Sequence, residues 1–366
     1  MLKLEYKPNA AETVERLRAL VERKAQDRIF ALFRIPTKAM GKFIRTHEAD
    51  FSPDYPDPRE RIRFWDELLA EGSVLEDDSI PYAYPSEFDQ GLYGGLLGGD
   101  VRFLCMAESG WNSSGWISSM IPPLLRDWSE FDALHFDEGH LWFTRYVNQL
   151  NVMTEAAGGK FGISHFTLID SLNFVYELVG ATNTYLSLYE RPEMVRKAVD
   201  FAFDLNLKIH RTFFDIVPDL DGGTCGYVLP WIPGQILCES VDPFHMTSVS
   251  DFEKWGVEPI KRIFREFDGG VIHLHGNGGH LLEAVCQLPG LKAIRFSNDW
   301  PRIIDILQEL RRRAGDMPLT VNVSYPEFVE ALKRHKLPGG MFFNVYGEID
   351  AYTANKCMEA VRAYRV

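Results

Sequence analysis

The sequence predicts an α/β fold, a (β/α)8 or TIM barrel in which a single domain spans residues 1–366. An N-terminal helix and a tryptophan-rich insertion after the second strand are expected in addition to the barrel. Eight short apolar runs have the character of buried strands, and nearly all of them precede a stretch with the apolar spacing of a helix. A chain of 366 residues, of which 46% are hydrophobic and 25% charged, is within the range of such a barrel with insertions.

The expected elements alternate along most of the chain. A helix over residues 10–26 comes first, because Val14, Leu17 and Leu20 fall on one helical face. Ser250 and Glu253 have the spacing of a capping box at the start of a later helix. The expected strands cover 28–33, 79–84, 160–168, 224–229, the run around His273, 292–296, 319–323 and 341–345. Further helices are expected near 60–70, 143–157, 192–216, 250–267, 279–287 and 301–313, and from 326 and 354.

Residues 85–142 interrupt the alternation of strands and helices. The segment holds four tryptophans, many glycines and serines, and a hairpin-like run at 101–106. It is too rich in aromatic residues to be disordered, so we expect an ordered insertion near the mouth of the barrel. Its tryptophans either pack for stability or form a lid on a flat or apolar ligand.

The charge of the chain excludes some kinds of partner. The difference between 39 basic and 52 acidic residues is −13, and the one basic run, 311–313, lies on a helical pattern. We therefore expect neither a nucleic acid nor an anionic membrane as partner. No apolar run approaches the ~20 residues that span a bilayer, and the first residues contain no apolar signal core. The five cysteines are scattered without CxxC spacing, which indicates free thiols and a cytoplasmic location.

His273 and His275 are the strongest candidates for chemistry. Residues two apart in a strand point to the same side, and these two stand at the end of a buried strand, before a glycine turn. Two adjacent imidazoles suit one half of a metal site. In the alternative interpretation, one ring packs in the interior and the other bonds a backbone carbonyl.

Two carboxylates are expected to complete this metal site. Asp299 follows the sixth strand and Glu348 follows the eighth, so both are expected at the same rim as the histidines. Nitrogen and carboxylate ligands suit zinc, and also iron or manganese. Alternatively, Asp299 caps the helix that follows it and Glu348 is a solvated loop residue.

The second half of the chain resembles a known family. The similar segments are 189–194, 231–234, 247–252, 273–277, 288–294 and 342–344 with Thr353. Their order and spacing, over roughly residues 159–366, resemble the uroporphyrinogen decarboxylase superfamily. That superfamily also contains zinc-dependent methyltransferases that transfer methyl groups to or from corrinoids.

For the decarboxylase branch, the resemblance implies an anion-binding end of strand one. Those enzymes bind substrate carboxylates through two arginines, of which Arg34 matches the first while Lys38 stands at the second position. The aspartate that they carry after strand two has no counterpart in 80–85, and Gly347 replaces their last histidine. Because of these departures, we do not expect the chain to be a true porphyrinogen decarboxylase.

The methyltransferase branch carries His-x-Cys on strand five and a second cysteine after strand eight. Here His275 stands at the first cysteine position, and the second falls at or beside Glu348. The resemblance thus implies metal bound by two histidines and a carboxylate in place of a histidine and two thiolates.

Three functions are consistent with these observations. The first is a metal-dependent methyltransferase that works with a corrinoid, on a small-molecule substrate and with a corrinoid protein as partner. The second is a metal-free decarboxylase or lyase acting on an acidic substrate, and the third is a barrel that binds a tetrapyrrole or a protein without catalysis. Homodimerisation stays open. The expected catalytic residues are Arg34, Lys38, Tyr227 and Asn344, the expected cofactor-binding residues are Trp111, Trp116 and Asn277, and the expected metal ligands are His273, His275, Glu348 and Asp299.

Overall fold

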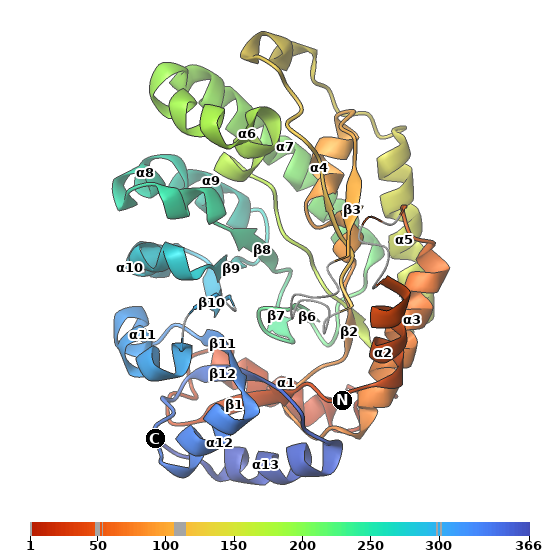
Figure 1. Ribbon diagram of the computed structural model, residues 1–366, viewed down its shortest axis with the longest axis vertical. Coiled ribbons are helices and arrows are strands. Elements are labelled where there is room, and N and C mark those ends of the chain that lie inside the picture. The colour runs from red at the N-terminus through yellow and green to blue at the C-terminus, as the bar shows by residue number, and fades with distance from the viewer. Residues whose placement is uncertain (1, 48–51, 53, 106–114, 298, 301) are drawn as a thin grey trace.

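The computed structural model describes the whole chain except residues 1, 48–51, 53, 106–114, 298 and 301 (Figure 1). The helices are α1 (Ala10–Val21), α2 (Lys38–His47), α3 (Pro58–Glu71), α4 (Gly91–Leu96), α5 (Leu141–Ala157), α6 (Ser171–Glu190), α7 (Pro192–Ile216), α8 (Val249–Trp255), α9 (Val257–Phe264), α10 (Leu282–Cys286), α11 (Leu307–Ala314), α12 (Tyr325–Lys333) and α13 (Ala351–Ala363). The strands are β1 (Ile29–Phe33), β2 (Tyr82–Ala83), β3 (Arg102–Leu104), β4 (Ser118–Met120), β5 (Gly162–Ile163), β6 (Gly223–Thr224), β7 (Ile232–Pro233), β8 (Leu237–Ser240), β9 (Gly270–Leu274), β10 (Leu291–Phe296), β11 (Leu319–Ser324) and β12 (Met341–Tyr346).

A parallel sheet forms the centre of the molecule. Its six strands lie in the order β1-β12-β11-β10-β9-β8, and each neighbouring pair is parallel. Strands β2 and β5 form a separate parallel pair, and isolated parallel bridges join Ser164 to Cys225 and Thr167 to Cys238. The predicted α/β fold with a parallel sheet is confirmed. Closure into one eight-stranded barrel stays a prediction, since no continuous ladder joins β2 and β5 to the six-stranded sheet in the described residues.

Two aspartates join the segment before β2 to β1 where a strand ladder is absent. The backbone N–H of Asp78 donates to the Ala31 carbonyl at 2.9 Å, and the Asp78 side chain accepts from the Ala31 N–H at 3.0 Å. The Asp77 side chain accepts from the Phe33 N–H at 2.8 Å. These carboxylates satisfy buried backbone donors of β1 that would otherwise be unpaired.

The prediction of a strand at 224–229 is wrong for most of its length. Gly223–Thr224 forms β6, which pairs antiparallel with β7, and beyond it only Cys225 pairs, through the isolated parallel bridge to Ser164. The edge of the main sheet is β8, which the sequence interpretation missed. The sequence Cys-Glu-Ser in this strand is not typical of a buried strand, yet Glu239 is fully buried. The segment 224–229 contains Gly226 and leads into Pro230, and both residues disfavour a central strand.

The capping box at the start of α8 lies two residues earlier than expected. The Ser248 side chain accepts from the Asp251 N–H, and the Asp251 side chain accepts in return from the Ser248 N–H. Ser250 is instead the second residue of the helix. The pattern Ser-x-x-acid occurs twice in overlapping positions here, so spacing alone does not select the cap.

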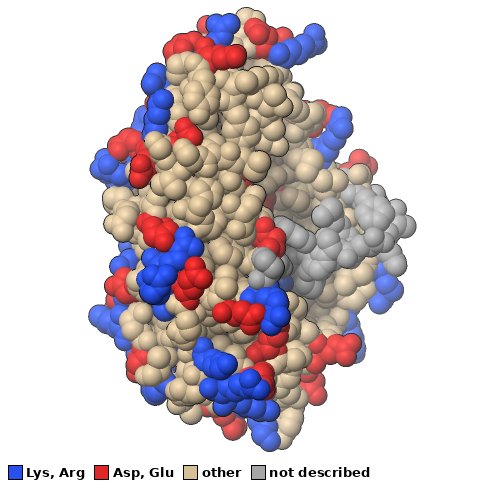
Figure 2. Space-filling model, turned by 60° about the vertical axis from the view of Figure 1, so that its left-hand side comes forward, with Lys and Arg blue, Asp and Glu red and all other residues tan. Residues whose placement is uncertain are grey.

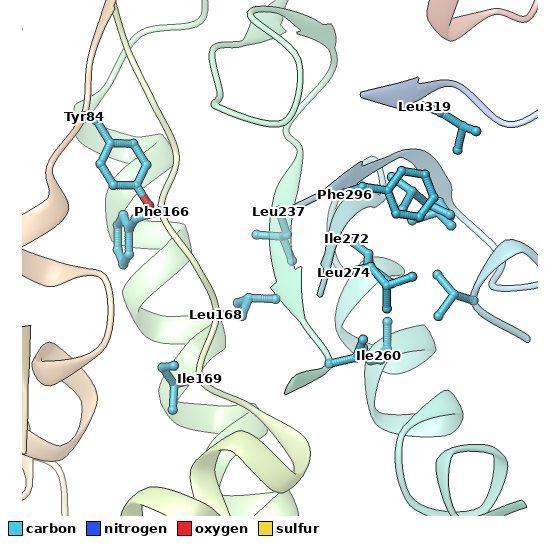
Figure 3. Close-up of a cluster of buried hydrophobic side chains, with 14 of the residues drawn as sticks. Tyr84, Phe166, Leu168, Ile169, Leu237, Ile260, Ile272, Leu274, Phe296 and Leu319 are labelled. Atoms are coloured by element: carbon cyan, nitrogen blue, oxygen red, sulfur yellow. The ribbon is translucent and has the colours of Figure 1, made fainter. Parts of the chain in front are cut away.

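The two faces of the main sheet pack against different layers. One face, with Leu237, Ile272 and Phe296, contributes to the large core beneath the outer helices (Figure 3). The opposite face, here called the inner face, carries Phe30, Val271, Ala293 and Phe342, and these pack with apolar residues of α1. Because strand residues alternate between faces, the inner face continues through Arg34, His273, Arg295, Asn322 and Asn344 toward the carboxyl ends of the strands.

The insertion at 85–142 contributes aromatic contacts next to this inner face. The Trp116 ring stacks on the Tyr84 ring, with centroids 4.5 Å apart, and Tyr84 directly follows β2. Trp116 also meets the Tyr227 ring edge-on at 5.6 Å. Trp116 therefore lies at the carboxyl end of β2. The expectation that the whole segment covers a barrel mouth stays a prediction.

Candidate metal centre

His273 and His275 point toward each other, as their spacing on the strand predicted. His273 is the fourth residue of β9 and His275 immediately follows the strand. Their Nε2 atoms lie 2.9 Å apart, and both side chains are partly buried. Zinc binds imidazole nitrogen at about 2.0–2.1 Å, so two nitrogens on one ion lie roughly 3 Å apart. The alternative of one packed ring and one ring bonded to a carbonyl does not describe this pair.

Asp242 supplies the carboxylate of the group. It follows β8 by two residues, at the start of the short helical turn Asp242–Met246. One ligand atom each from Asp242, His273 and His275 lie within 4.8 Å of one another, and Asp242 Oδ1 is 3.7 Å from His275 Nε2. Although 41% of the Asp242 side chain is exposed, its Oδ1 is buried and has no hydrogen-bond partner. A buried oxygen without a donor, beside two imidazole nitrogens, fits a cation.

Asp299 holds His275 from the other side of the ring. Its Oδ2 lies 3.1 Å from His275 Nδ1, and both of its oxygens accept from the Gly276 N–H at 3.2 Å. A carboxylate on Nδ1 directs Nε2 toward Asp242 and His273, which is how metal-binding histidines are commonly oriented. Asp299 is thus not one of the three residues whose ligand atoms converge, and its expected role as a direct ligand stays a prediction.

Two histidines at this site, His273 and His245, favour the neutral form that metal binding requires. Burial lowers the pKa of His273 well below its usual value, and the charge of His275 acts in the same direction. Burial, followed by the charge of His275, lowers the pKa of His245 to about 4. His245 is buried with its Nε2 unpaired, and its ring centroid lies 5.7 Å from that of His275. Neutral imidazoles keep a lone pair available for a cation.

Glu348 does not belong to this group. It is exposed, beyond the end of β12, and makes no hydrogen bond or ion pair with the described residues. Gly347, with φ of +128°, redirects the chain just before it. Glu348 is an exposed loop residue outside the converging group, and the carboxylate that lies in that group is Asp242.

Sequence reasoning missed Asp242 and His245 because it missed β8. With the fourth strand placed at 224–229, the run Val241-Asp-Pro-Phe-His245 had no assigned position at the rim. The signal that would have found it is an acid and a histidine three residues apart, directly after an extended segment. This spacing indicates a site only when β8 has been recognised as a strand.

Arg34 and Arg295 bring two positive charges to the inner face. Arg34 immediately follows β1, and its side chain has no hydrogen bond or ion pair with the described residues. Arg295, on β10, donates to the Tyr227 carbonyl and, at 3.1 Å, to Asn322 Oδ1. Burial lowers the pKa of both guanidinium groups, and for Arg295 the charge of Arg34 is the next cause. The sequence predicted the first arginine; Arg295 was missed as part of an apolar strand.

The other predicted residues divide into two groups. Tyr227 and Asn344 lie on the inner face: the Tyr227 ring is 6.2 Å from that of His273, and Asn344 is buried on β12. Lys38 is exposed at the start of α2, where its backbone N–H bonds Glu71, and no described contact joins its side chain to Arg34.

Asn277 is exposed in the turn after β9 and touches none of the metal-site residues through a hydrogen bond. Trp116 lies beside Tyr227, as described above, whereas Trp111 lies outside the described residues.

A cavity of about 620 Å³ lies at the opposite ends of the strands. Its lining includes Gly162, Gly223 and Asp268, which stand at or just before the beginnings of β5, β6 and β9. None of the predicted site residues borders it. The convergent polar groups are at the carboxyl ends of the strands, away from this cavity, and we place the site with them.

Comparisons with known proteins support the fold. No protein-family model matches the chain, and no curated protein matches it. Among solved structures, the chain is similar to a methyltransferase from Methanosarcina mazei, with a TM-score of 0.59 and 12% sequence identity. The similarity covers 96% of this chain and 98% of that chain. At this identity the likeness establishes a shared fold over the whole length.

Proposed function

We propose that the protein is a metal-dependent methyltransferase that exchanges methyl groups with a corrinoid, which a partner protein carries. The observation that carries this proposal is the convergence of Asp242, His273 and His275 within 4.8 Å at the carboxyl ends of the strands. The whole-length similarity to a methyltransferase structure supports it. No helix of the described residues is long and apolar enough to cross a membrane.

The three ligand residues fit zinc or a similar divalent transition metal. When bound there, the metal would act as a Lewis acid that lowers the pKa of a coordinated thiol, alcohol or water. Asp299 fixes the ring of His275 through Nδ1, whereas Ser297 Oγ lies 3.0 Å from His273 Nε2, so a metal bound at that nitrogen would displace the hydroxyl. The Asp299 contact limits rotation of the His275 ring and keeps its Nε2 directed at the site.

The aromatic side chains beside the metal centre suit the approach of an apolar group. Tyr227 stands between His273 and Trp116, with ring centroids 6.2 Å and 5.6 Å away. Burial raises the pKa of Tyr227 well above its usual value, so its hydroxyl stays protonated. We assign Tyr227 and Trp116 to excluding water and orienting the acceptor, and Arg34 to its anionic end.

The direct test is methyl transfer from free methylcobalamin to a small thiol, followed by the loss of methylcobalamin absorbance. We expect turnover that needs zinc, is lost after chelation, and falls to background in His275→Ala. His135→Ala is the matched control, because His135 is exposed and bonds only the nearby Ala133 carbonyl. Turnover that persists in chelated protein and in His275→Ala would contradict the proposal.

One observation favours a carboxy-lyase as a second candidate. Two partly buried guanidinium groups without a carboxylate partner among the described residues suit a substrate that brings its own acid groups. A metal-free decarboxylase would release CO2 from such a substrate at the same rate with and without chelator. The same assay pair therefore separates the two candidates.

A further inference from the structure

The inner face presents a set of hydrogen-bond donors with too few acceptors. Arg34 has all of its side-chain donors free of protein partners among the described residues. The side-chain amide nitrogens of Asn322 and Asn344 are buried and unpaired. Arg295 uses two of its nitrogens, on the Tyr227 carbonyl and Asn322 Oδ1, and has no ion pair.

The strand register places these four side chains together. Leu32 on β1 pairs with Asn344 on β12, and Asn344 pairs in turn with Asn322 on β11. Arg34 is two residues beyond Leu32, so its side chain leaves β1 on the same face. Arg295 reaches this row through its hydrogen bond to Asn322. Donors from four adjacent strands therefore share one surface.

Burying such charges without a counterion is costly. A buried guanidinium group that lacks a carboxylate loses hydration without recovering an ion pair, and two neighbouring groups repel each other. The fully buried cations Lys7 and Arg61 each have a carboxylate partner, Asp77 and Glu87. Arg34 and Arg295 are partly buried, their charges act on each other, and neither has a carboxylate partner among the described residues, so an acidic group from outside the chain would relieve both.

We infer that Arg34, Arg295, Asn322 and Asn344 form a binding site for the acidic part of the substrate, with two negative charges in total. Carboxylate groups fit best, because guanidinium groups bind them through paired, charge-assisted hydrogen bonds, and the amide nitrogens supply further donors. The site lies on the inner face that carries His273 on the neighbouring strand β9. This assignment rests on the proposed function only in treating the inner face as the substrate side.

The test is calorimetric titration of chelated, full-length protein with malonate, acetate and inorganic phosphate at matched ionic strength. We expect malonate to bind more tightly than acetate, and Arg295→Gln to weaken malonate at least about tenfold. Phosphate serves to distinguish a dicarboxylate site from a general dianion site, since a dicarboxylate site prefers malonate. Arg334→Gln is the matched control, because Arg334 is an exposed arginine paired with Glu330.

A second variant keeps the test decisive if Arg295→Gln is unstable. Asn344→Asp places a carboxylate beside the two guanidinium groups, so the ligand-free protein should melt at a higher temperature while malonate binding is lost. A merely structural role for Asn344 predicts the opposite change in melting temperature. Failure of malonate and phosphate to bind, unchanged malonate affinity in Arg295→Gln, or retained binding in Asn344→Asp would overturn the assignment.

The malonate titration and the measurement of bound metal can fail separately. Protein that holds no metal but binds malonate through Arg295 would overturn the proposed methyltransferase and leave this site in place. Protein that holds metal at His273 and His275 but ignores all three anions would do the reverse.

Discussion

Asp242, at the residue scale, combines features that its neighbours lack. Its Oδ1 is buried without a hydrogen-bond donor, whereas both oxygens of Asp299 contact Gly276 or His275. Burial raises the pKa of Asp242, and the adjacent His275 opposes that change. A cation near this carboxylate would stabilise it, because the attraction between the two charges offsets the free energy lost when the carboxylate is desolvated.

Single residues were predictable from the sequence where a short pattern carried the chemistry. The spacing of His273 and His275 and the position of Arg34 after a strand were enough to place them on the inner face. Arg295 and Asp242 were not predictable in this way, because their roles depend on neighbours that are distant in sequence. Arg295 meets Asn322, and Asp242 meets His275 more than thirty residues later.

Glu177 should make the stability of the protein depend on pH. It is partly buried on α6, its Oε2 is buried and unpaired, and burial raises its pKa to about 8, against a hydrogen bond from the Gly94 backbone. Between about pH 4.5 and 8 the folded protein retains this proton while the unfolded chain releases it, so stability falls as pH rises. Glutamine does not titrate, so the Glu177→Gln variant should not show this fall in the free energy of unfolding. We expect the variant to be more stable than the wild type by up to about 5 kcal/mol above pH 8.

The measurement is urea denaturation of both proteins from pH 5 to pH 9. The difference between them should grow with pH and level off near pH 9. Glu359→Gln, at an exposed position on α13, is the control and should give a difference that does not change with pH. A Glu177→Gln difference that is equally flat would contradict the assigned burial.

At the scale of elements, the contact between β1 and the segment before β2 depends on charge. Asp78 receives a bidentate interaction from Arg16, at 2.6 and 3.0 Å, while accepting from the Ala31 backbone. Lys7, which is buried, pairs with Asp77 at 3.0 Å and also donates to two backbone carbonyls. α1 and the residues before it are thereby fixed to the edge of the sheet.

We therefore expect Asp78→Asn to destabilise the protein by about 3 kcal/mol, because it leaves a largely buried arginine without its counterion. The shift in urea midpoint measures this loss. Asp316→Asn breaks an exposed pair with Arg23 and should cost no more than about 1 kcal/mol. Equal losses in the two variants would show that the Asp78 contact contributes no more than a surface pair.

Elements with a clear apolar period were predictable, and the strands β1, β9, β10, β11 and β12 lie close to their expected positions. β8 was not, because only Leu237 and Cys238 of its four residues are hydrophobic and Glu239 and Ser240 follow them. Glu239 is fully buried, and burial raises its pKa well above the usual value, yet glutamate is typical of surface positions. Hydrophobic patterning cannot recognise such a strand.

On the scale of the whole molecule, an acidic surface encloses a basic inner face. The net charge is −13, and Figure 2 shows acidic and basic side chains interspersed on one face around a broad uncharged area. The two unpaired arginines of the inner face therefore lie inside a molecule whose long-range field repels anions. Short-range contacts at Arg34 and Arg295, rather than attraction from a distance, must then select an acidic substrate.

The proposed function depends most on which residues bind the metal. The measurement is the transition-metal content of protein purified without chelators, for wild type, Asp242→Ala and Glu348→Ala. We predict about one equivalent in the wild type and in Glu348→Ala, and less than about a tenth of an equivalent in Asp242→Ala. Metal that survives in Asp242→Ala but is lost in Glu348→Ala, or a wild type that contains none, would contradict the account.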